Sequence, residues 1–225
     1  MAQSLSPRAK AFPSGLYGVT PDWDQRQTLE HAVRLAAKGG MTALQLRQKA
    51  ANSSLRRELA EHLLPICRQA GVALIINDDW RLAQAIGADG VHLGRDDDDP
   101  AMVRAALGPN MYLGVSCYGD LDRAKDMLAL NVDYVAFGAM FASGTKPQAP
   151  PIALGVLTQA RALVDDIAPQ AGVVAIGGIT TDNAASVLQA GADCLAVVGG
   201  LFLSPDIEQT ARQFSALVAA SPKRQ

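Results

Sequence analysis

The sequence predicts an α/β fold, a (β/α)8 TIM barrel formed by a single domain. Eight short apolar runs recur at intervals of roughly 20–35 residues with helical patterns between them, which is typical of repeated βαβ units. The runs are continuous rather than alternating, as in strands that are buried on both faces. The length of 225 residues also suits a barrel, since α/β barrels often have about 200–250 residues. An open doubly wound sheet is the alternative, but no G-x-G-x-x-G follows an early run, which argues against its dinucleotide-binding form.

The predicted strands are the eight apolar runs themselves. In chain order they cover residues 16–19, 43–46, 73–76, 90–93, 112–115, 134–137, 173–176 and 194–198. The helical segments fill the gaps between them. Residues 24–38 carry apolar side chains on one helical face and are followed by Gly39 as a stop. Residues 180–182 are expected to cap a helix that runs to Gln189.

Three turns into strands resemble one another weakly. Residues 86–89, 130–133 and 189–193 each end in an aspartate directly before an apolar run. This repetition agrees with a barrel, in which the active site lies at the C-terminal ends of the strands. Functional side chains are therefore expected just after each apolar run.

Composition and the chain ends limit the classes of function. Residues 14–220 form the predicted catalytic domain, with a polar leader at 1–13 and a frayed tail at 221–225. The net charge of −2 does not favour a nucleic-acid partner. No apolar stretch approaches the ~20 residues of a membrane helix, and the leader lacks an apolar signal core. The odd number of cysteines without metal-type spacing favours a reducing cytoplasm.

Acidic clusters follow two neighbouring predicted strands. Asn77, Asp78 and Asp79 follow the third strand, and residues 95–99 include four aspartates after the fourth. Two convergent carboxylates suit Mg²⁺ when phosphate oxygens supply its other ligands. We expect Asp78 and Asp97 to be the ligands, and the other aspartates to cap helices or to be solvated.

Cations and hydroxyls follow other strands. Gln45, Arg47 and Lys49 alternate, so a strand or its extension would place them on one face, where Arg and Lys can hold phosphate oxygens. Ser116 ends the fifth strand and is expected to donate a hydrogen bond rather than to act as a nucleophile, since no histidine is expected beside it in a triad arrangement. A solvated strand end is the alternative interpretation for the cations.

Glycine-rich loops follow the last three strands. Residues 143–147 contain Ser143, Thr145 and Lys146, which together can cradle an anion. Gly177-Gly178 and Gly199-Gly200 end the seventh and eighth strands, where barrels frequently bind phosphate through backbone N–H groups. The chain thus predicts two phosphate sites, one cationic and one lined by backbone, which suggests that two phosphorylated substrates are joined.

Together these motifs resemble the thiamine-phosphate synthase family over nearly the whole chain. The resemblance is carried by residues 45–49 (QLRQK), 76–79 (INDD), 89–94 (DGVHLG), 114–116 (GVS), 145–146 (TK) and 175–184 (AIGGITTDNA). The family joins 4-amino-2-methyl-5-hydroxymethylpyrimidine diphosphate to 4-methyl-5-(2-phosphoethyl)thiazole and releases pyrophosphate. The resemblance therefore implies a Mg²⁺-assisted transferase with these two small-molecule partners. The sequence does not decide between a monomer and a homo-oligomer.

The resemblance also implies a role for each matching residue. Contacts to the pyrimidine diphosphate are implied for Gln45, Arg47, Lys49, Asn77, Ser116 and Lys146. Contacts to the thiazole phosphate are implied for Ser143, Thr145, Gly178, Val198 and Gly199, and Mg²⁺ ligation for Asp78 and Asp97. Among these, the predicted catalytic residues are Arg47, Lys49, Ser116 and Lys146.

The chain departs from the family at two places. The family usually carries a serine at the position of Gly199, so one hydroxyl donor is lost from the implied thiazole phosphate site. It also favours Gly-Pro where this chain has Gly138-Ala139, and a threonine where it has Ser143. Two alternatives remain: a thiazole tautomerase-like sister enzyme, which needs a catalytic histidine near the position of Tyr118, and a non-catalytic phosphate-binding barrel.

Overall fold

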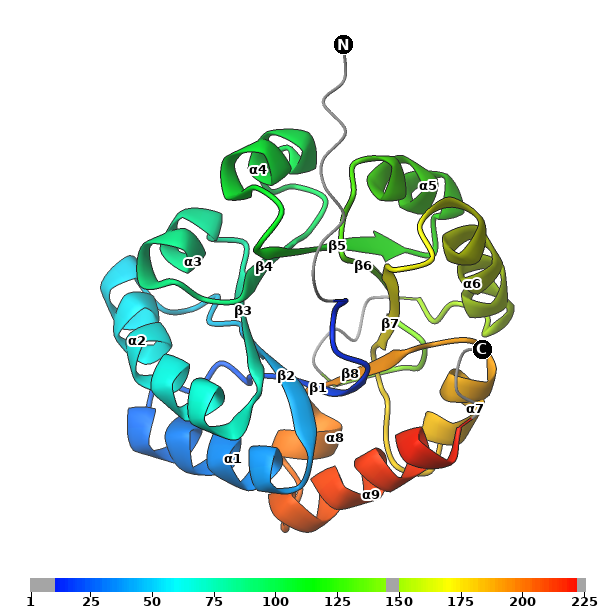
Figure 1. Ribbon diagram of the computed structural model, residues 1–225. Helices are drawn as coiled ribbons and strands as arrows, with labels where there is room; N and C mark the ends of the chain where they lie inside the picture. Colours follow the sequence, from blue (N-terminus) through cyan, green and yellow to red (C-terminus); the bar gives the residue numbers. More distant parts are fainter. Residues whose placement is uncertain (1–10, 145–149, 222–225) are drawn as a thin grey trace.

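The computed structural model describes residues 11–144 and 150–221, and these form a closed parallel barrel surrounded by helices (Figure 1). The predicted (β/α)8 fold is confirmed. The strands are β1 (Gly15–Val19), β2 (Met41–Leu46), β3 (Ala73–Asn77), β4 (Gly90–Leu93), β5 (Tyr112–Tyr118), β6 (Tyr134–Phe137), β7 (Gly172–Ile176) and β8 (Cys194–Val197). Each strand pairs in parallel with its chain neighbours, and β8 closes the barrel on β1.

Helices form the outer layer of the molecule (Figure 1). They are α1 (Arg26–Lys38), α2 (Ser53–Ala70), α3 (Trp80–Ile86), α4 (Pro100–Leu107), α5 (Leu121–Ala129), α6 (Gly155–Ile167), α7 (Ala184–Gln189), α8 (Gly199–Phe202) and α9 (Ile207–Ala220). In the described part of the chain, no helix is long and apolar enough to span a membrane.

Two hydrophobic clusters explain why the apolar runs are continuous. One cluster lies between the strands and the helices and includes Leu44, Leu74 and Val135. The other fills the barrel and combines large side chains, such as Tyr134, with small ones, such as Ala43. Every strand except β4 contributes to both clusters, so both of its faces are apolar, whereas β4 contributes only to the outer one.

The element bounds differ from the predicted ones in two informative places. β5 continues to Tyr118, beyond the predicted end at residue 115. The helix expected to be capped by residues 180–182 begins only at Ala184, and Asn183 at its cap position makes no side-chain capping bond. The Asn183 carboxamide instead accepts the Thr180 N–H at 2.9 Å, so these residues form a turn before the helix.

Phe12 lies at the N-terminal ends of the strands, although it falls within the predicted leader. Its ring contacts the rings of Tyr17, Tyr112 and Tyr134 at centroid distances of 4.2–5.4 Å. Only 7% of Phe12 is exposed. The barrel core therefore begins at least two residues before the predicted domain boundary at residue 14.

The three repeated aspartates share one structural role. Asp89, Asp133 and Asp193 each directly precede a strand. Each carboxylate accepts a backbone N–H near the start of the preceding strand, at 2.7–2.8 Å; the donors are Leu74, Leu113 and Val173. The backbone N–H of each aspartate in turn donates to the carbonyl of the residue whose N–H its carboxylate accepts, at 2.8–3.0 Å. Each aspartate thus clamps a strand pair at the N-terminal end of the barrel.

Candidate active site

A cavity of about 780 Å³ opens at the C-terminal ends of the strands. It is lined by every predicted site residue that the structure describes, namely Gln45, Arg47, Lys49, Asn77, Asp78, Asp97, Ser116, Ser143, Gly178, Val198 and Gly199. Thr145 and Lys146 lie outside the described residues. The structure therefore brings these residues together around one cavity, and their roles in binding or catalysis remain predictions.

Asp78 and Asp97 converge on the acidic side of this cavity. Asp78 follows β3 with a left-handed φ of 64°, a conformation that aspartate tolerates better than most residues. Its N–H donates to the His92 carbonyl at 2.8 Å, which fixes it to the end of β4. Asp97 is held by the Gly94 N–H, which donates to its Oδ2 at 2.6 Å.

The environment of Asp78 disfavours its charged form. Burial raises its pKa to about 6, with further increases from the hydrogen bond and the charge of Asp97, while Lys49 and Arg47 act in the opposite direction. Two carboxylates held this close are stabilised by a cation between them. The pair therefore fits Mg²⁺, with further oxygen ligands from outside the protein, since the described residues contain no group of three or more acidic, histidine or cysteine side chains suited to a metal.

The other aspartates are mostly tied to α3 and α4. As predicted, Asp79 caps α3 by accepting the Leu82 N–H, and Asp99 caps α4. Asp98 is exposed, as expected of a solvated charge, but it also has fixed partners. Its carboxylate accepts hydrogen bonds from Trp80 Nε1 at 2.7 Å and from Arg81 at 2.9 Å, which joins α3 to the turn after β4 and lowers the pKa of Asp98.

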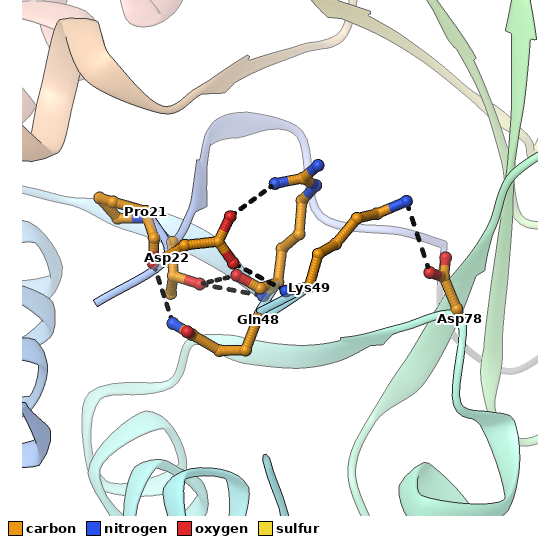
Figure 2. Close-up of polar contacts among 7 residues, drawn as sticks. Pro21, Asp22, Gln48, Lys49 and Asp78 are labelled. Atoms are coloured by element: carbon orange, nitrogen blue, oxygen red, sulfur yellow. Dashed lines mark hydrogen bonds and ion pairs between the residues drawn. The ribbon is translucent and has the colours of Figure 1, made fainter. Parts of the chain in front are cut away.

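The loop after β1 holds the cationic segment that follows β2. The buried Thr20 hydroxyl accepts the Arg47 N–H at 2.9 Å, and Asp22 accepts the Lys49 N–H at 2.7 Å. Gln48 donates from its side chain to the Pro21 carbonyl at 2.9 Å (Figure 2). These contacts were not foreseen from the sequence, because they join loops that are 25–27 residues apart.

Arg47 and Lys49 lie at the mouth of the cavity rather than in its interior. The side chain of Lys49 is 58% exposed, and its Nζ is 3.9 Å from Asp78 Oδ2 (Figure 2). Arg47 is 19% exposed and lies 3.5 Å from Asp22 Oδ2. Neither contact is a short ion pair, so both cations can turn toward an anionic ligand at little cost.

Ser116 has a histidine partner, which corrects the expectation from the sequence. His92 Nε2 lies 2.9 Å from Ser116 Oγ. The histidine was passed over because β4 and β5 pair at His92 and Gly114, and this register is not visible in the sequence. Arg123 also fixes the end of β5, because its Nε donates to the Ser116 carbonyl at 2.9 Å.

The opposite side of the cavity is formed by glycine-rich backbone. Gly178 has a φ of 63°, and a Cβ there would collide with the backbone of Phe141 and Ala142. The Phe141 N–H donates to the Gly177 carbonyl at 3.0 Å, so the loops after β6 and β7 lie against each other. This side has no described cation lining the cavity, in contrast to the side of Arg47 and Lys49.

The arrangement agrees with the match to known families. A family model described as thiamine monophosphate synthase matches residues 16–201, which is most of the chain. The chain belongs to this family. The thiamine-phosphate synthase of Bordetella bronchiseptica is 56% identical over 212 residues, which cover 94% of this chain and 98% of that protein. The thiamine-phosphate synthase of Azoarcus sp. is 49% identical and is covered to 97%, with 91% of this chain aligned.

Solved structures agree with the family assignment. The thiamine phosphate pyrophosphorylase from Pyrococcus furiosus superposes with a TM-score of 0.78 at 30% identity, covering 91% of this chain and 95% of that one. A 3-hexulose-6-phosphate synthase superposes with a TM-score of 0.65 at 20% identity, over 90% of this chain and 99% of that one, and shows the shared fold alone. As a member of the thiamine monophosphate synthase family, the chain is an enzyme, a transferase of thiamine biosynthesis.

Proposed function

We propose that this enzyme joins 4-amino-2-methyl-5-hydroxymethylpyrimidine diphosphate to 4-methyl-5-(2-phosphoethyl)thiazole and releases pyrophosphate. The observation that carries the proposal is the asymmetry of the cavity. One side offers Arg47 and Lys49 beside two carboxylates, and the other offers glycine-rich backbone. A diphosphate with a metal suits the first side, and a monophosphate suits the second.

Asp78 and Asp97 are the residues that would hold Mg²⁺. The raised pKa of Asp78 supports this assignment, because it reflects first the burial of the carboxylate and then its approach to Asp97, and a bound cation would relieve both. When bound, Mg²⁺ would neutralise the negative charge that develops on the departing diphosphate. Two carboxylates alone leave most coordination positions of Mg²⁺ open, so oxygens of the diphosphate would supply further ligands.

The residues of the chain suit a dissociative substitution. Arg47, Lys49 and, by proposal, Lys146 would bind the diphosphate and stabilise its charge as the bond to the pyrimidine methylene breaks. The amino group of the pyrimidine can stabilise the resulting carbocation, and the thiazole nitrogen then attacks it. This sequence of steps requires no protein nucleophile. Positioning the two substrates in one cavity would supply much of the rate.

The glycine side is proposed to bind the thiazole phosphate. Gly178, Val198 and Gly199 would present backbone to the phosphate, and Ser143 and Thr145 would add hydroxyl donors. Because this phosphate is retained in the product, neutral donors suffice, whereas the leaving diphosphate gains charge and benefits from cations.

The two alternatives make different demands on the site. A tautomerase-like enzyme would need a catalytic histidine near Tyr118, whose ring is stacked with the Arg95 guanidinium at 4.7 Å. It would have no use for the Asp78–Asp97 pair. A non-catalytic barrel would have no need for two sides of different charge. Both alternatives are therefore less well supported than the synthase.

A pyrophosphate-release assay tests the proposal directly. Release is expected only when both substrates and Mg²⁺ are present, and chelation of the metal should abolish it. Release that needs neither the thiazole phosphate nor the metal would contradict the proposal. The three cysteines are free and buried, which suits the reducing cytoplasm where we place the reaction.

A further inference from the structure

A continuous chain of hydrogen bonds runs through the inside of the barrel to the floor of the cavity. Gln45 Nε2 donates to the Tyr17 hydroxyl at 2.9 Å, and this hydroxyl lies 2.9 Å from that of Tyr134. The Tyr134 hydroxyl is 3.1 Å from His92 Nδ1, and His92 Nε2 is 2.9 Å from Ser116 Oγ. Five side chains from β1, β2, β4, β5 and β6 are thus linked in one line.

The two tyrosines in the middle of this chain are shielded from solvent. Tyr17 is 1% exposed and Tyr134 is fully buried. Burial raises the pKa of both phenols well above the ordinary value, so both hydroxyls keep their protons at any pH of biological interest. The His92 ring is stacked on the Tyr134 ring with an interplanar angle of 14°, which limits the rotation of the imidazole.

The donor at the start of the chain sets the direction of the bonds that follow. An amide nitrogen can only donate, so the Tyr17 oxygen accepts from Gln45. A buried hydroxyl hydrogen without an acceptor is costly, and the Gln45 nitrogen cannot accept. The Tyr17 hydrogen is therefore assigned to the Tyr134 oxygen, and the Tyr134 hydrogen to His92 Nδ1. A neutral imidazole that accepts at Nδ1 carries its proton at Nε2. His92 Nε2 therefore donates to Ser116 Oγ.

This direction determines what Ser116 can offer to a ligand. If His92 carried its proton at Nδ1, Nε2 would accept the Ser116 hydrogen, and only oxygen lone pairs would face the cavity. With the proton at Nε2, the Ser116 oxygen accepts from histidine and its own hydrogen remains available. The serine can then donate to an acceptor atom in the cavity.

We propose that Tyr17 and Tyr134 are positioning residues that fix His92 as the Nε2-protonated tautomer, so that Ser116 donates its hydrogen to a ring nitrogen of the pyrimidine. The identity of this ligand rests on the proposed function. The tautomer itself is a property of the free protein. The chain of bonds makes the floor of the cavity selective for a substrate with an acceptor at this point.

The tautomer can be measured by nitrogen NMR of the ¹⁵N-labelled full chain without substrate. The protein has three histidines, of which His31 and His62 are exposed and His92 is buried. The signals of the His92 ring can be assigned because they disappear in the variant His92→Asn. We expect a protonated Nε2 and an unprotonated Nδ1 in the wild type. In Tyr134→Phe, Nδ1 loses its donor, and we expect a mixture of both tautomers.

Kinetics of the same variants report on the substrate. We expect Tyr134→Phe to raise the KM for the pyrimidine diphosphate about fivefold with a smaller change in kcat, because the bond to the ring nitrogen is made when the substrate binds and weakens as positive charge develops on the ring. Tyr17→Phe should have a smaller effect, since Tyr134 can still donate to His92.

Tyr112→Phe is the matched control. Tyr112 is another barrel tyrosine, and its hydroxyl donates to the Ala11 carbonyl at 3.1 Å, away from the chain of bonds. The control should leave the tautomer and the KM unchanged, whereas a merely structural effect would appear equally in both variants.

Two results would overturn the proposal. One is an Nδ1-protonated His92 in the wild type, and the other is a Tyr134→Phe variant with the tautomer and the KM of Tyr112→Phe. A wild-type enzyme that shows the expected tautomer but no turnover of the two substrates would instead contradict the proposed function, and would overturn the pyrimidine contact with it.

Discussion

The two ends of the barrel use aspartates in opposite ways. At the N-terminal end, Asp133 accepts the Leu113 N–H and forms an ion pair with Arg104, and both partners are about nine-tenths buried. At the C-terminal end, Asp78 faces Asp97, and the nearest Lys49 nitrogen is 3.9 Å away. The first carboxylate has its hydrogen-bonding partners within the protein, and the second has a neighbour of the same charge.

This difference separates stability from function along the barrel axis. Carboxylates whose partners are backbone N–H groups and arginine hold strands together, and they leave nothing for a ligand to bind. Carboxylates that repel each other raise the free energy of the protein until a cation is bound. The same residue type therefore stabilises the fold at one end and binds metal, by proposal, at the other.

The largest effect is expected from breaking the N-terminal clamp. Asp133→Ala removes the negative charge that faces the buried Arg104 and the acceptor of the Leu113 N–H, so we expect a loss of about 3–5 kcal/mol in the free energy of unfolding. Chemical denaturation measures it. Turnover per folded molecule should stay within about twofold, since the clamp lies at the end opposite the cavity.

The neutral variant Asp133→Asn serves as the control for the charge. It keeps an acceptor for the Leu113 N–H and loses the ion pair, so its cost should fall between zero and that of Asp133→Ala. A loss below about 1 kcal/mol in Asp133→Ala would show that the clamp does not support the fold.

The second effect is expected from Asp78→Asn at the C-terminal end. Asparagine tolerates the left-handed φ of 64°, so the backbone should be preserved. We expect a fall of about 10²-fold in the rate of thiamine phosphate formation, by analogy with the loss of one charge-stabilising contact. Steady-state kinetics with saturating Mg²⁺ measure the fall, and near-normal turnover would refute the assignment of Asp78 as a ligand.

The sequence predicted these two regions unequally well. The fold followed from continuous apolar runs, because a strand buried on both faces leaves that pattern in the residues themselves. The rim followed from the polar residues directly after the runs. The contact of His92 with Ser116 did not, because it depends on how two strands pair. The link from Asp98 to Trp80 was also missed, since it joins the turn after β4 to α3 and depends on how these elements pack.

The third effect concerns the stability of the metal-free protein. The pKa of Asp78 is about 6 in the folded state and 3.8 as a free side chain, so the folded protein binds this proton more tightly than the unfolded chain. Its stabilising contribution is fully present below pH 4 and is lost as the pH rises through 6. Because Asp78 is a third exposed, we expect a discounted change of about 1 kcal/mol, or about 2–4 °C in Tm.

Comparison with Asp78→Asn isolates the contribution of the Asp78–Asp97 pair, since the titrating groups elsewhere in the protein are the same. The Tm of the wild type should fall relative to that of Asp78→Asn between pH 4 and pH 7. A constant difference over this range would mean that the burial of Asp78 and its approach to Asp97 do not lower the stability of the fold. Added Mg²⁺ and pyrophosphate should restore the Tm of the wild type at pH 7 but should not raise that of Asp78→Asn.

The smallest effect is expected from glycines at the two ends. Gly90 begins β4 at the N-terminal end, where a Cβ would collide with Tyr112 backbone and side chain, whereas a Cβ on Gly199 would meet only the flexible Leu203 side chain at 3.4 Å. Gly199→Ser should fold normally, because there is room for its side chain, and should restore the hydroxyl that the family usually carries. We expect its KM for the thiazole phosphate to fall about three- to fivefold, the contribution of one hydrogen bond. Gly90→Ser should lower the Tm instead, because the tightly packed N-terminal end has no room for the side chain. An unchanged KM in a stable Gly199→Ser would mean that this loop does not hold the phosphate, and that the space at the C-terminal end serves another part of the substrate.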